Sequence, residues 1–361
     1  MTQTLSPSER RDWLRLARTG GVGPVLFHEL IRRHGEPARA LAALPALAER
    51  AGRVADIPSE AAIEAELAAG AALGAHLLCA CERAFPQALA ALDPPPPVLW
   101  TRGDLAQLQR PLVALVGARV ASAAGQRFAR GLAAELGAAG YGVVSGMARG
   151  IDGAAHEGAL ASGTVAVLGG GVDDIYPHEH GELYRQIVAQ GCVVAEHPPG
   201  RKAQARDFPR RNRVIAGLAR AVVVVEAELR SGSLITARLA GEMGRDVLAV
   251  PGSPLDPRAR GTNDLIRQGA AICEGADDVL RALETFGGFR APDQPVFQEA
   301  ESEADARLVA RIAELLSPTP VSRDELIRAT RAPAGAVAAA LVELAVAGKA
   351  ELLPGGMAAM A

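Results

Sequence analysis

The sequence predicts an α/β protein whose largest part is a doubly wound, mostly parallel sheet. Between about residues 91 and 286, short apolar runs alternate with helical stretches. The runs are almost continuously apolar, which indicates strands buried on both faces and therefore a parallel sheet covered by helices. This architecture is Rossmann-like. The predicted strands are Leu112–Val116, Gly142–Ser145, Val165–Leu168, Cys192–Ala195, Val222–Val225 and Val247–Val250.

Residues 1–90 are predicted to form a small helical domain. Apolar residues recur at helical spacing on both sides of the turn Gly20–Pro24. Helix, glycine-rich turn and helix outline a helix-hairpin-helix, whose turn amides can face a phosphate. Alternatively, the glycines only provide the backbone freedom of a tight helix connection, and the sequence favours this simpler reading. The proline run Pro94–Pro97 cannot be helical and marks the passage into the sheet domain.

The last part of the chain is predicted to be a winged helix over residues 305–361, after a linker at residues 287–304. Three short helices, Ala306–Leu316, Arg323–Thr330 and Ala334–Ala347, precede a tail with the pattern of a hairpin. The third helix of such a module normally reads DNA. Here it contains a glutamate and no lysine or arginine, so it is poorly suited to binding in a groove of DNA. We expect it to contact protein or to act as a spacer.

Composition narrows the function classes only slightly. The 361 residues carry a formal net charge of −3, so a nucleic-acid site must be a local basic patch. The four cysteines lack zinc-ligand spacing and are expected to be reduced. There is no apolar signal core at the N-terminus and no apolar run long enough to span a membrane. We therefore expect a cytoplasmic protein without a metal, a cofactor or a membrane partner.

The predicted strand ends carry residues suited to binding phosphate. Ligands of a doubly wound sheet sit at the carboxyl ends of its strands. Glycine lets backbone amides approach an anion, serine adds a donor, and arginine offers a planar fork. Several such loops on one sheet edge suggest several phosphates, as in a polynucleotide. The loops are Gly117–Arg119, Ser145–Asp152, Gly169–Gly171, Arg230–Ser233 and Pro251–Ser253.

The dinucleotide fingerprint is absent from these loops. The pattern GxGxxG at the first loop would need glycines where the chain has Arg119 and Ser122. The triplet Gly169–Gly171 continues as Val-Asp-Asp without the last glycine. NAD and FAD are therefore not expected as ligands.

The densest basic cluster is Phe208–Arg213, with Arg201, Lys202 and Arg206 before it. Arginines beside an aromatic ring are typical of single-strand sites, which combine phosphate charge with base stacking. Alternatively, the cluster is only the solvated start of a helix. Beside the glycine loops, phosphate binding is favoured.

A catalytic constellation is hard to assemble. His156 lies four residues after Asp152, on one helical face, but we expect it to be a structural hydrogen-bonding residue under the glycine loop. Glu226, at the end of the fifth predicted strand, is the best single candidate for a general base. It has no evident partner, so no enzyme activity is predicted.

Read in order, the motifs resemble the DNA-processing protein A family (DprA, also called Smf). The resemblance covers nearly the whole sheet domain, and more loosely the two end domains. Its blocks are VALVGAR at 113–119, SGMARGIDGAAHEGAL at 145–160, TVAVLGGGVDDIYP at 164–177, FPRRNRVIAGLA at 208–219, VVVVEAELRSGSLITARLA at 222–240, AVPG at 249–252 and GTNDLI at 261–266.

The resemblance implies a homodimeric, non-enzymatic protein that captures single-stranded DNA during natural transformation, protects it and loads the recombinase RecA onto it. Replacing Arg119 or Arg211 by alanine should then weaken DNA binding without unfolding the protein. The motif matches and the loop chemistry together predict a DNA site made of Gly117, Arg119, Ser145, Gly146, Arg149, Gly150, Phe208, Arg211, Asn212, Arg213, Ser231, Gly232 and Ser233.

Two other functions remain open. A nucleotide-processing enzyme of the phosphoribohydrolase (lysine-decarboxylase-like) group uses a related fold with a PGGxGTxxE loop. The chain has Ser231–Thr236 at the corresponding place and lacks both the PGG and the glutamate. A transcriptional regulator that reads duplex DNA through the winged helix is disfavoured by the uncharged third helix.

Overall fold

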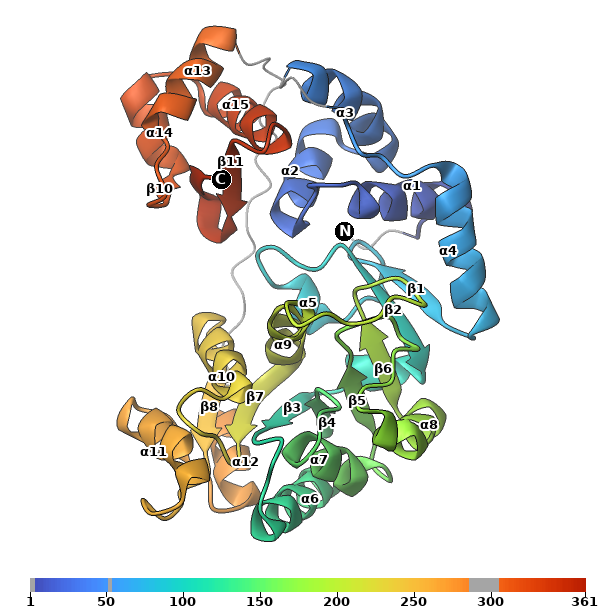
Figure 1. Cartoon of the computed structure of the whole chain (residues 1–361), viewed down its shortest axis with the longest axis vertical. Coiled ribbons are helices and arrows are strands. Elements are labelled where there is room, and N and C mark those ends of the chain that lie inside the picture. Colours follow the sequence, from blue (N-terminus) through green and yellow to red (C-terminus); the bar gives the residue numbers. More distant parts are fainter. Residues whose placement is uncertain (1–3, 51–53, 286–304) are drawn as a thin grey trace.

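The computed structural model describes residues 4–50, 54–285 and 305–361. A nine-stranded sheet with its helices fills the lower part of the view in Figure 1, and the helical domain and the winged helix lie side by side above it. The predicted linker at 287–304 lies outside the described residues. The strands are β1 (His76–Cys79), β2 (Val98–Gly103), β3 (Leu112–Val116), β4 (Gly142–Ser145), β5 (Thr164–Val167), β6 (Cys192–Ala195), β7 (Ala219–Val224), β8 (Asp246–Ala249) and β9 (Ala271–Ile272).

The predicted Rossmann-like sheet is confirmed. Its strand order is β1-β2-β6-β5-β4-β3-β7-β8-β9, and the strands from β6 to β9 are parallel. Strands β4 to β6 lie on one side of β3, and β7 to β9 lie on the other. At such a switch point a crevice opens at the carboxyl ends of the strands. The helices of this domain are α5 (Gln87–Ala90), α6 (Ala123–Ala138), α7 (Ile151–Ala159), α8 (Gly181–Gln190), α9 (Asp207–Leu218), α10 (Gly232–Glu242), α11 (Arg260–Arg267) and α12 (Ala276–Thr285).

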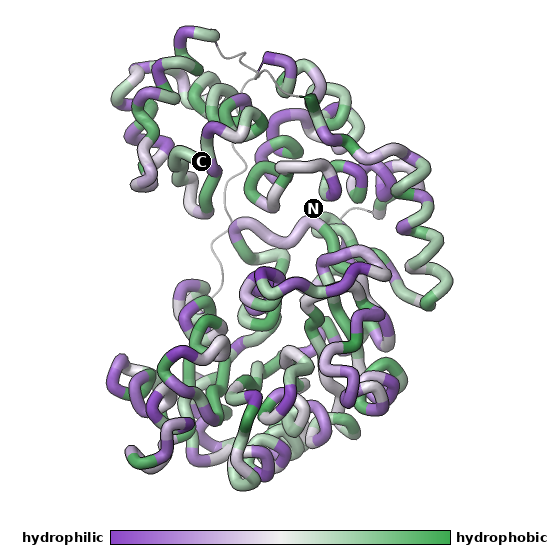
Figure 2. Tube along the Cα trace, viewed as in Figure 1, coloured by the Kyte–Doolittle hydropathy of each residue, from purple (hydrophilic) through white to green (hydrophobic). Residues whose placement is uncertain are grey.

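Helices cover both faces of the sheet, as its apolar strands require. On one face α9 and α10 pack through residues such as Ile215 and Ala237. On the other face α6, α7 and α12 pack through residues such as Leu132 and Val279. Figure 2 shows the hydrophobic residues gathered along the central strands between these layers. The core therefore consists of two apolar layers, and they hold the strand ends in fixed positions.

The sheet begins earlier in the chain than the boundary at residue 90. Strand β1 lies within the segment expected to be helical, and it pairs antiparallel with β2, which in turn pairs antiparallel with β6. Burial explains this, because β1 and β2 supply the apolar side chains Leu77, Leu78 and Trp100 to the core. Their short apolar runs lie on either side of the proline-rich segment, and the sequence pattern there does not distinguish them as strands.

The helical domain consists of α1, α2, α3 and α4 and is fastened to the sheet through Trp100. Its indole Nε1 donates to Glu66 at 2.8 Å, and a Cβ on Gly70 would lie 2.2 Å from the ring. Glu66 also accepts from Arg18 at 2.8 Å. These contacts tie the domain to strand β2. The helices are α1 (Pro7–Arg18), α2 (Pro24–His34), α3 (Pro37–Arg50) and α4 (Glu60–Ala72).

The turn Gly20–Pro24 connects α1 and α2 and is engaged within the chain. The amide of Gly20 donates to the carbonyl of Asp56 at 2.9 Å. The carboxylate of Asp56 lies so close that its Oδ2 would be 2.5 Å from a Cβ on Gly20. A carboxylate in that position repels phosphate, so the geometry favours a tight helix connection over a phosphate-binding turn.

The C-terminal part is a winged helix, as predicted. Strand β12 lies between β10 and β11, and α13, α14 and α15 pack on this small sheet. The third helix, α15, also packs on α2 and α3, with Val342 fully buried there. Arg323, at the start of α14, pairs with Glu29 of α2 at 3.3 Å. The elements are α13 (Ala306–Leu315), β10 (Val321–Ser322), α14 (Arg323–Thr330), α15 (Ala334–Val346), β11 (Ala350–Leu353) and β12 (Met357–Met360).

The position of α15 explains its composition. A helix that packs against protein on several sides needs small apolar residues, and α15 contains mainly alanine, valine and leucine. The expected contact with protein is therefore made inside the same chain, with the helical domain.

Candidate nucleic-acid interface

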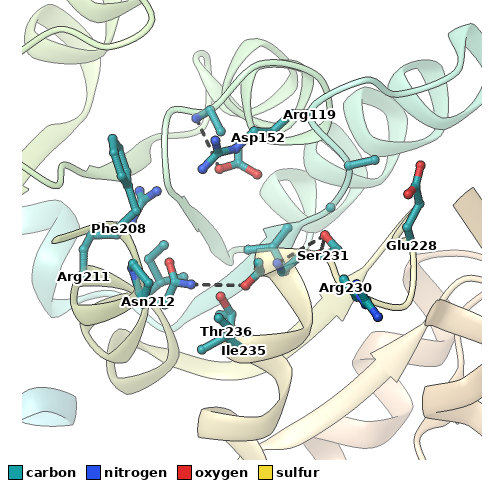
Figure 3. A pocket seen from close by; sticks show the side chains of 18 of the residues that line it. Arg119, Asp152, Phe208, Arg211, Asn212, Glu228, Arg230, Ser231, Ile235 and Thr236 are labelled. Carbon is teal, nitrogen blue, oxygen red and sulfur yellow. Dashed lines mark hydrogen bonds between the residues drawn. The ribbon is translucent and has the colours of Figure 1, made fainter. Parts of the chain in front are cut away.

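The ends of β3, β4 and β7 and the start of α9 surround a pocket of about 610 Å³ (Figure 3). Figure 3 shows side chains from α9 on one side of the pocket and the Arg230–Ser233 segment on another. The predicted site residues that line it are Gly117, Arg119, Phe208, Arg211, Asn212, Ser231, Gly232 and Ser233. The residues that sequence reasoning left outside its site include Asp152, Glu228 and Arg230.

Two glycines let the first two loops pack against each other. Gly150 has φ +73°, and a Cβ there would lie 2.3 Å from the carbonyl oxygen of Ala118. A Cβ on Gly117 would lie 2.6 Å from Cγ1 of Ile151. The amide of Ile151 donates to the same Ala118 carbonyl at 3.2 Å. The role of both glycines is therefore to bring the loop after β3 and the loop after β4 together.

Arg211 is the buried cation of the pocket. Its side chain is only 7% exposed, and its Nη1 donates to the carbonyls of Gly146 and Val167, each at 2.5 Å. Burial lowers the pKa of this guanidinium to about 10, which leaves it charged at neutral pH. Truncation would strand two carbonyls and open a cavity. We therefore expect Arg211→Ala to destabilise the fold as well as to weaken DNA binding, whereas the sequence alone suggested that the fold would stay intact.

Asp152 lies under the second loop. Its Oδ2 accepts from the amides of Gly146 and Ala148 at 3.1 and 3.3 Å. Burial raises the pKa of this carboxyl, while the charge of Arg211 and the two amides act in the opposite direction. The carboxylate therefore holds the loop and partly balances the buried arginine.

The start of α10 gives the pocket a set of hydrogen-bond donors. Ser231 caps the helix by accepting from the amide of Ser233 at 3.4 Å, and the two hydroxyls are 2.7 Å apart. Asn212 donates to the carbonyl of Gly232 at 3.2 Å and so links α9 to this loop. A helix start carries partial positive charge, and the serine hydroxyls beside it add groups that can donate to an anion.

Glu226 occupies the start of α6, where a related fold would hold a phosphate. Its carboxylate accepts from the amide of Ser122 at 2.9 Å and from the Ser122 hydroxyl at 2.5 Å. A Cβ on Gly125 would lie 2.6 Å from the carboxylate. Glu226 thus holds Ser122, the N-cap residue of α6, and its carboxylate has a structural partner. The same carboxylate would repel a pyrophosphate, in agreement with the missing fingerprint.

An aromatic and cationic cluster lies beside the pocket. The guanidinium of Arg119 lies over the ring of Phe208, 5.6 Å from its centroid. The ring of Tyr176 lies 5.7 Å from that of Phe208. These side chains line a second pocket of about 260 Å³, which also includes Gly146 and Arg149. Sequence reasoning did not select Tyr176, although it lies in the quoted block that ends in Tyr-Pro.

Neither pocket is lined by Ser145 and Arg213 of the predicted site, or by Arg201 and Lys202, which precede the basic cluster. Ser145 is buried and donates its hydroxyl to the carbonyl of Leu115 at 2.6 Å. Arg213 pairs with Glu196. Arg201 pairs with Asp207 at 3.0 Å, and Lys202 pairs with Asp174 at 3.2 Å. Each of these side chains therefore already has a partner within the chain.

The Gly169–Gly171 loop is likewise filled by the protein. A Cβ on Gly170 would lie 2.3 Å from Oδ2 of Asp174, and one on Gly171 would lie 2.5 Å from the carbonyl oxygen of Pro198. The glycines are needed for close packing, and Asp174 accepts from the amide of Ala203 at 2.7 Å. This loop therefore does not present its backbone to an anion.

His156 has the structural surroundings that the sequence suggests. It is fully buried, and its Nδ1 lies 2.7 Å from the hydroxyl of Thr164. That hydroxyl donates to the carbonyl of Val143 at 3.0 Å, so it accepts from the imidazole. Burial lowers the pKa of His156 to about 3, with smaller contributions from His180 and Arg211.

This shift predicts a pH-dependent stability. The unfolded chain binds a proton at His156 below about pH 6.5 while the folded chain does not, so stability is lost as the pH falls from 6.5 towards 3. Between pH 7 and pH 5, His156 alone should remove about 2 kcal/mol from the free energy of unfolding. Urea titrations of the parent and of His156→Gln at both pH values measure this difference. An equal loss in both proteins would contradict the assignment.

Within residues 4–50, 54–285 and 305–361, no group of three or more histidine, cysteine or acidic side chains is placed to hold a metal ion. In the same ranges, no single helix is long and apolar enough to cross a membrane. One pair of helices, Arg323–Thr330 and Ala334–Val346, is long and apolar enough when the two are taken together, but the pair is bent by 113°.

The fold and pocket define a Rossmann-like protein with an arginine-lined crevice at the strand ends and two small accessory domains. Comparison with known proteins then identifies the family. The model of DNA recombination-mediator protein A matches residues 76–284, the DprA-like N-terminal HHH domain matches residues 7–69, and the DprA winged helix domain matches residues 297–356. The chain belongs to the DprA/Smf family of DNA-processing proteins.

Individual relatives agree with this assignment. Protein Smf of Escherichia coli is 38% identical over 78% of this chain and 76% of its own length. The structure of DNA processing protein A from Streptococcus pneumoniae has a TM-score of 0.64 at 30% identity, covering 77% of this chain and 98% of the other. The Helicobacter pylori protein, whose structure concerns its binding of single-stranded DNA, has a TM-score of 0.54 at 29% identity, covering 58% and 96%.

Proposed function

We propose that this protein binds single-stranded DNA through the crevice at the ends of β3, β4 and β7. The observation that carries the proposal is the convergence of positive charge on one pocket beside the start of α10 and the ring of Phe208. The exposed forks are those of Arg119 and Arg230, and the buried Arg211 adds its charge. Arginine forks and helix-start amides suit phosphates, and the ring suits a base. The reported single-strand binding of the Helicobacter pylori relative supports the same ligand.

The proposal covers the wider role that the family resemblance implies. The protein would protect incoming single strands in the cytoplasm and load RecA onto them during transformation or recombination, acting as a homodimer. Its role would be binding rather than catalysis. In support, Glu226 accepts from Ser122 and His156 bonds Thr164, so both titratable candidates have structural partners.

Fluorescence anisotropy with labelled oligothymidine and a matching duplex, each at two salt concentrations, tests the proposal. We expect preference for the single strand and a steep fall of affinity with salt, with a log–log slope of roughly −0.7 per contacted phosphate. Preference for the duplex, or no binding, would contradict the proposal and direct attention to nucleotide substrates. Recombinase loading is then measured as RecA filament formation on strands coated with a single-strand binding protein.

A further inference from the structure

The loop after β4 has a strained backbone at Met147. This residue has φ +63°, in the left-handed region that costs free energy for a side chain such as methionine. Its side chain is fully buried in the apolar core, so a change of conformation here would disturb the core. The loop also carries Gly146, Ala148 and Arg149, which line the pockets. Strain beside a binding site indicates that surrounding contacts hold the backbone in a shape that the site needs.

Side chains from two helices hold the backbone groups on either side of Met147. The carboxylate of Asp152, on α7, accepts from the amides of Gly146 and Ala148 at 3.1 and 3.3 Å. The guanidinium of Arg211, on α9, donates to the carbonyl of Gly146 at 2.5 Å. These bonds fix the two neighbours of the strained residue. They leave open which group holds the carbonyl of Met147 itself.

His180 holds the carbonyl of Met147. Its Nδ1 lies 3.1 Å from that oxygen, and because a carbonyl oxygen can only accept, the hydrogen must be on Nδ1. His180 comes from the short helical turn His178–His180, which lies between β5 and α8. A Cβ on Gly153 would lie 2.9 Å from Cε1 of the imidazole, so the ring packs directly on the first turn of α7. The imidazole is therefore fixed between that helix and the strained loop.

A second contact joins the same turn to the same loop, but it is exposed. Nε of Arg149 lies 3.3 Å from Oε1 of Glu179, and both side chains are 58% exposed. Exposed ion pairs contribute little, because water and salt screen them. The hydrogen bond from His180 is partly buried and reaches the strained residue itself. It is therefore the contact from this turn on which the shape of the loop depends.

We infer that His180 is a positioning residue for single-strand binding, which keeps the loop after β4 in the strained shape that presents Gly146 and Arg149 to the strand. The inference rests on the proposed single-strand binding and adds to it a residue that lines neither pocket. Without the hydrogen bond, Met147 would leave its left-handed conformation in a fraction of the molecules. The apparent affinity would then fall in proportion to the fraction that keeps the binding shape.

Anisotropy with labelled oligothymidine on the full chain tests this role. His180→Ala should bind roughly 2- to 15-fold more weakly than the parent, the range that corresponds to the loss of one net hydrogen bond. Its salt slope should equal the parental slope, because the bound complex keeps every phosphate contact. His180→Asn should recover most of the lost affinity, since its side-chain amide can donate to the same carbonyl.

His178→Ala is the matched control, because His178 belongs to the same turn and is exposed. Its affinity should equal that of the parent. Urea unfolding of each variant ensures that affinities are compared where all of the proteins are folded. A measurement without any variant uses nitrogen-15 NMR of the parent imidazoles. We expect the His180 ring to carry its hydrogen on Nδ1 and none on Nε2 at a pH where the ring is neutral.

The outcomes separate the two proposals. Parental affinity in His180→Ala, or an equal loss in His180→Asn, would overturn the positioning role while single-strand binding stands. A shallower salt slope in His180→Ala would overturn it as well, because His180 would then contact phosphate directly. A neutral ring with its hydrogen on Nε2 would contradict the hydrogen bond to Met147. Failure of the parent to bind any single strand would overturn the proposed function, and the positioning role with it.

Discussion

Gly150→Ala is expected to destabilise the sheet domain by roughly 2–5 kcal/mol and to reduce single-strand affinity more than tenfold. Gly150 has φ +73°, and the added Cβ would lie 2.3 Å from the carbonyl oxygen of Ala118 and 2.8 Å from that of Arg119. Both obstacles are backbone atoms, so no side chain can turn away to relieve them. The loops after β3 and β4 would have to separate, and Arg119 would leave its position between the two pockets.

Urea unfolding and anisotropy measure the two effects on the same preparation. Gly131→Ala is a matched control, because Gly131 lies exposed within α6 and a Cβ there would meet nothing within 4 Å. That change should stabilise the helix by about 1 kcal/mol without altering affinity. If Gly150→Ala unfolds at the same urea concentration as the parent, the close approach of the two loops is not as we describe it.

Arg119→Ala is expected to weaken single-strand binding by roughly 10- to 150-fold, the loss of one or two charge-assisted hydrogen bonds of about 1.5–3 kcal/mol in total. Its guanidinium lies over Phe208 and lines both pockets, and the residue is exposed. Because it is exposed, its removal should cost at most about 1 kcal/mol of stability. The log–log salt slope should become shallower by about 0.7 as one phosphate contact is lost.

Arg185→Ala provides the control for net charge. Arg185 lies on α8 with its side chain 72% exposed and pairs with Glu182 at 2.6 Å, so the substitution removes the same charge away from the pocket. Its affinity and salt slope should match the parent. Arg119→Lys retains the charge but not the planar fork, so its affinity for the single strand should lie between those of the parent and of Arg119→Ala. An unchanged slope in Arg119→Ala would show that this arginine does not contact phosphate.

The largest and most regular features of the fold follow from the sequence. The six short apolar runs form β3 to β8, with boundaries at or near those predicted, because a strand buried on both faces must be apolar throughout. The winged helix followed from three helices and a hairpin. Strands β1 and β2 did not follow, since they pair antiparallel at the sheet edge and flank the proline-rich segment.

The candidate site was predictable in composition but not in the role of each residue. The phosphate-type loops after β3, β4 and β7 do meet at one crevice, because parallel strands end at the same sheet edge. Arg211 and Arg119 have the same side chain, yet one is a buried clamp on two carbonyls and the other is exposed. Glu226 offered a carboxylate at a strand end, and its partner Ser122 lies 104 residues away in the chain.

The sequence by itself determined the parallel sheet, the winged helix and the edge at which the phosphate-type loops gather. These depend on local apolar patterns and on the rule that strand ends share an edge. Only the tertiary structure decided which polar groups have partners within the chain. Arg201 and Arg213 are paired with carboxylates in the fold, whereas Arg119 and Arg230 are exposed at the pocket. The fold also places Tyr176 beside Phe208. The physical reason is that a side chain is free for a ligand only when no distant residue has satisfied its charge or hydrogen bonds.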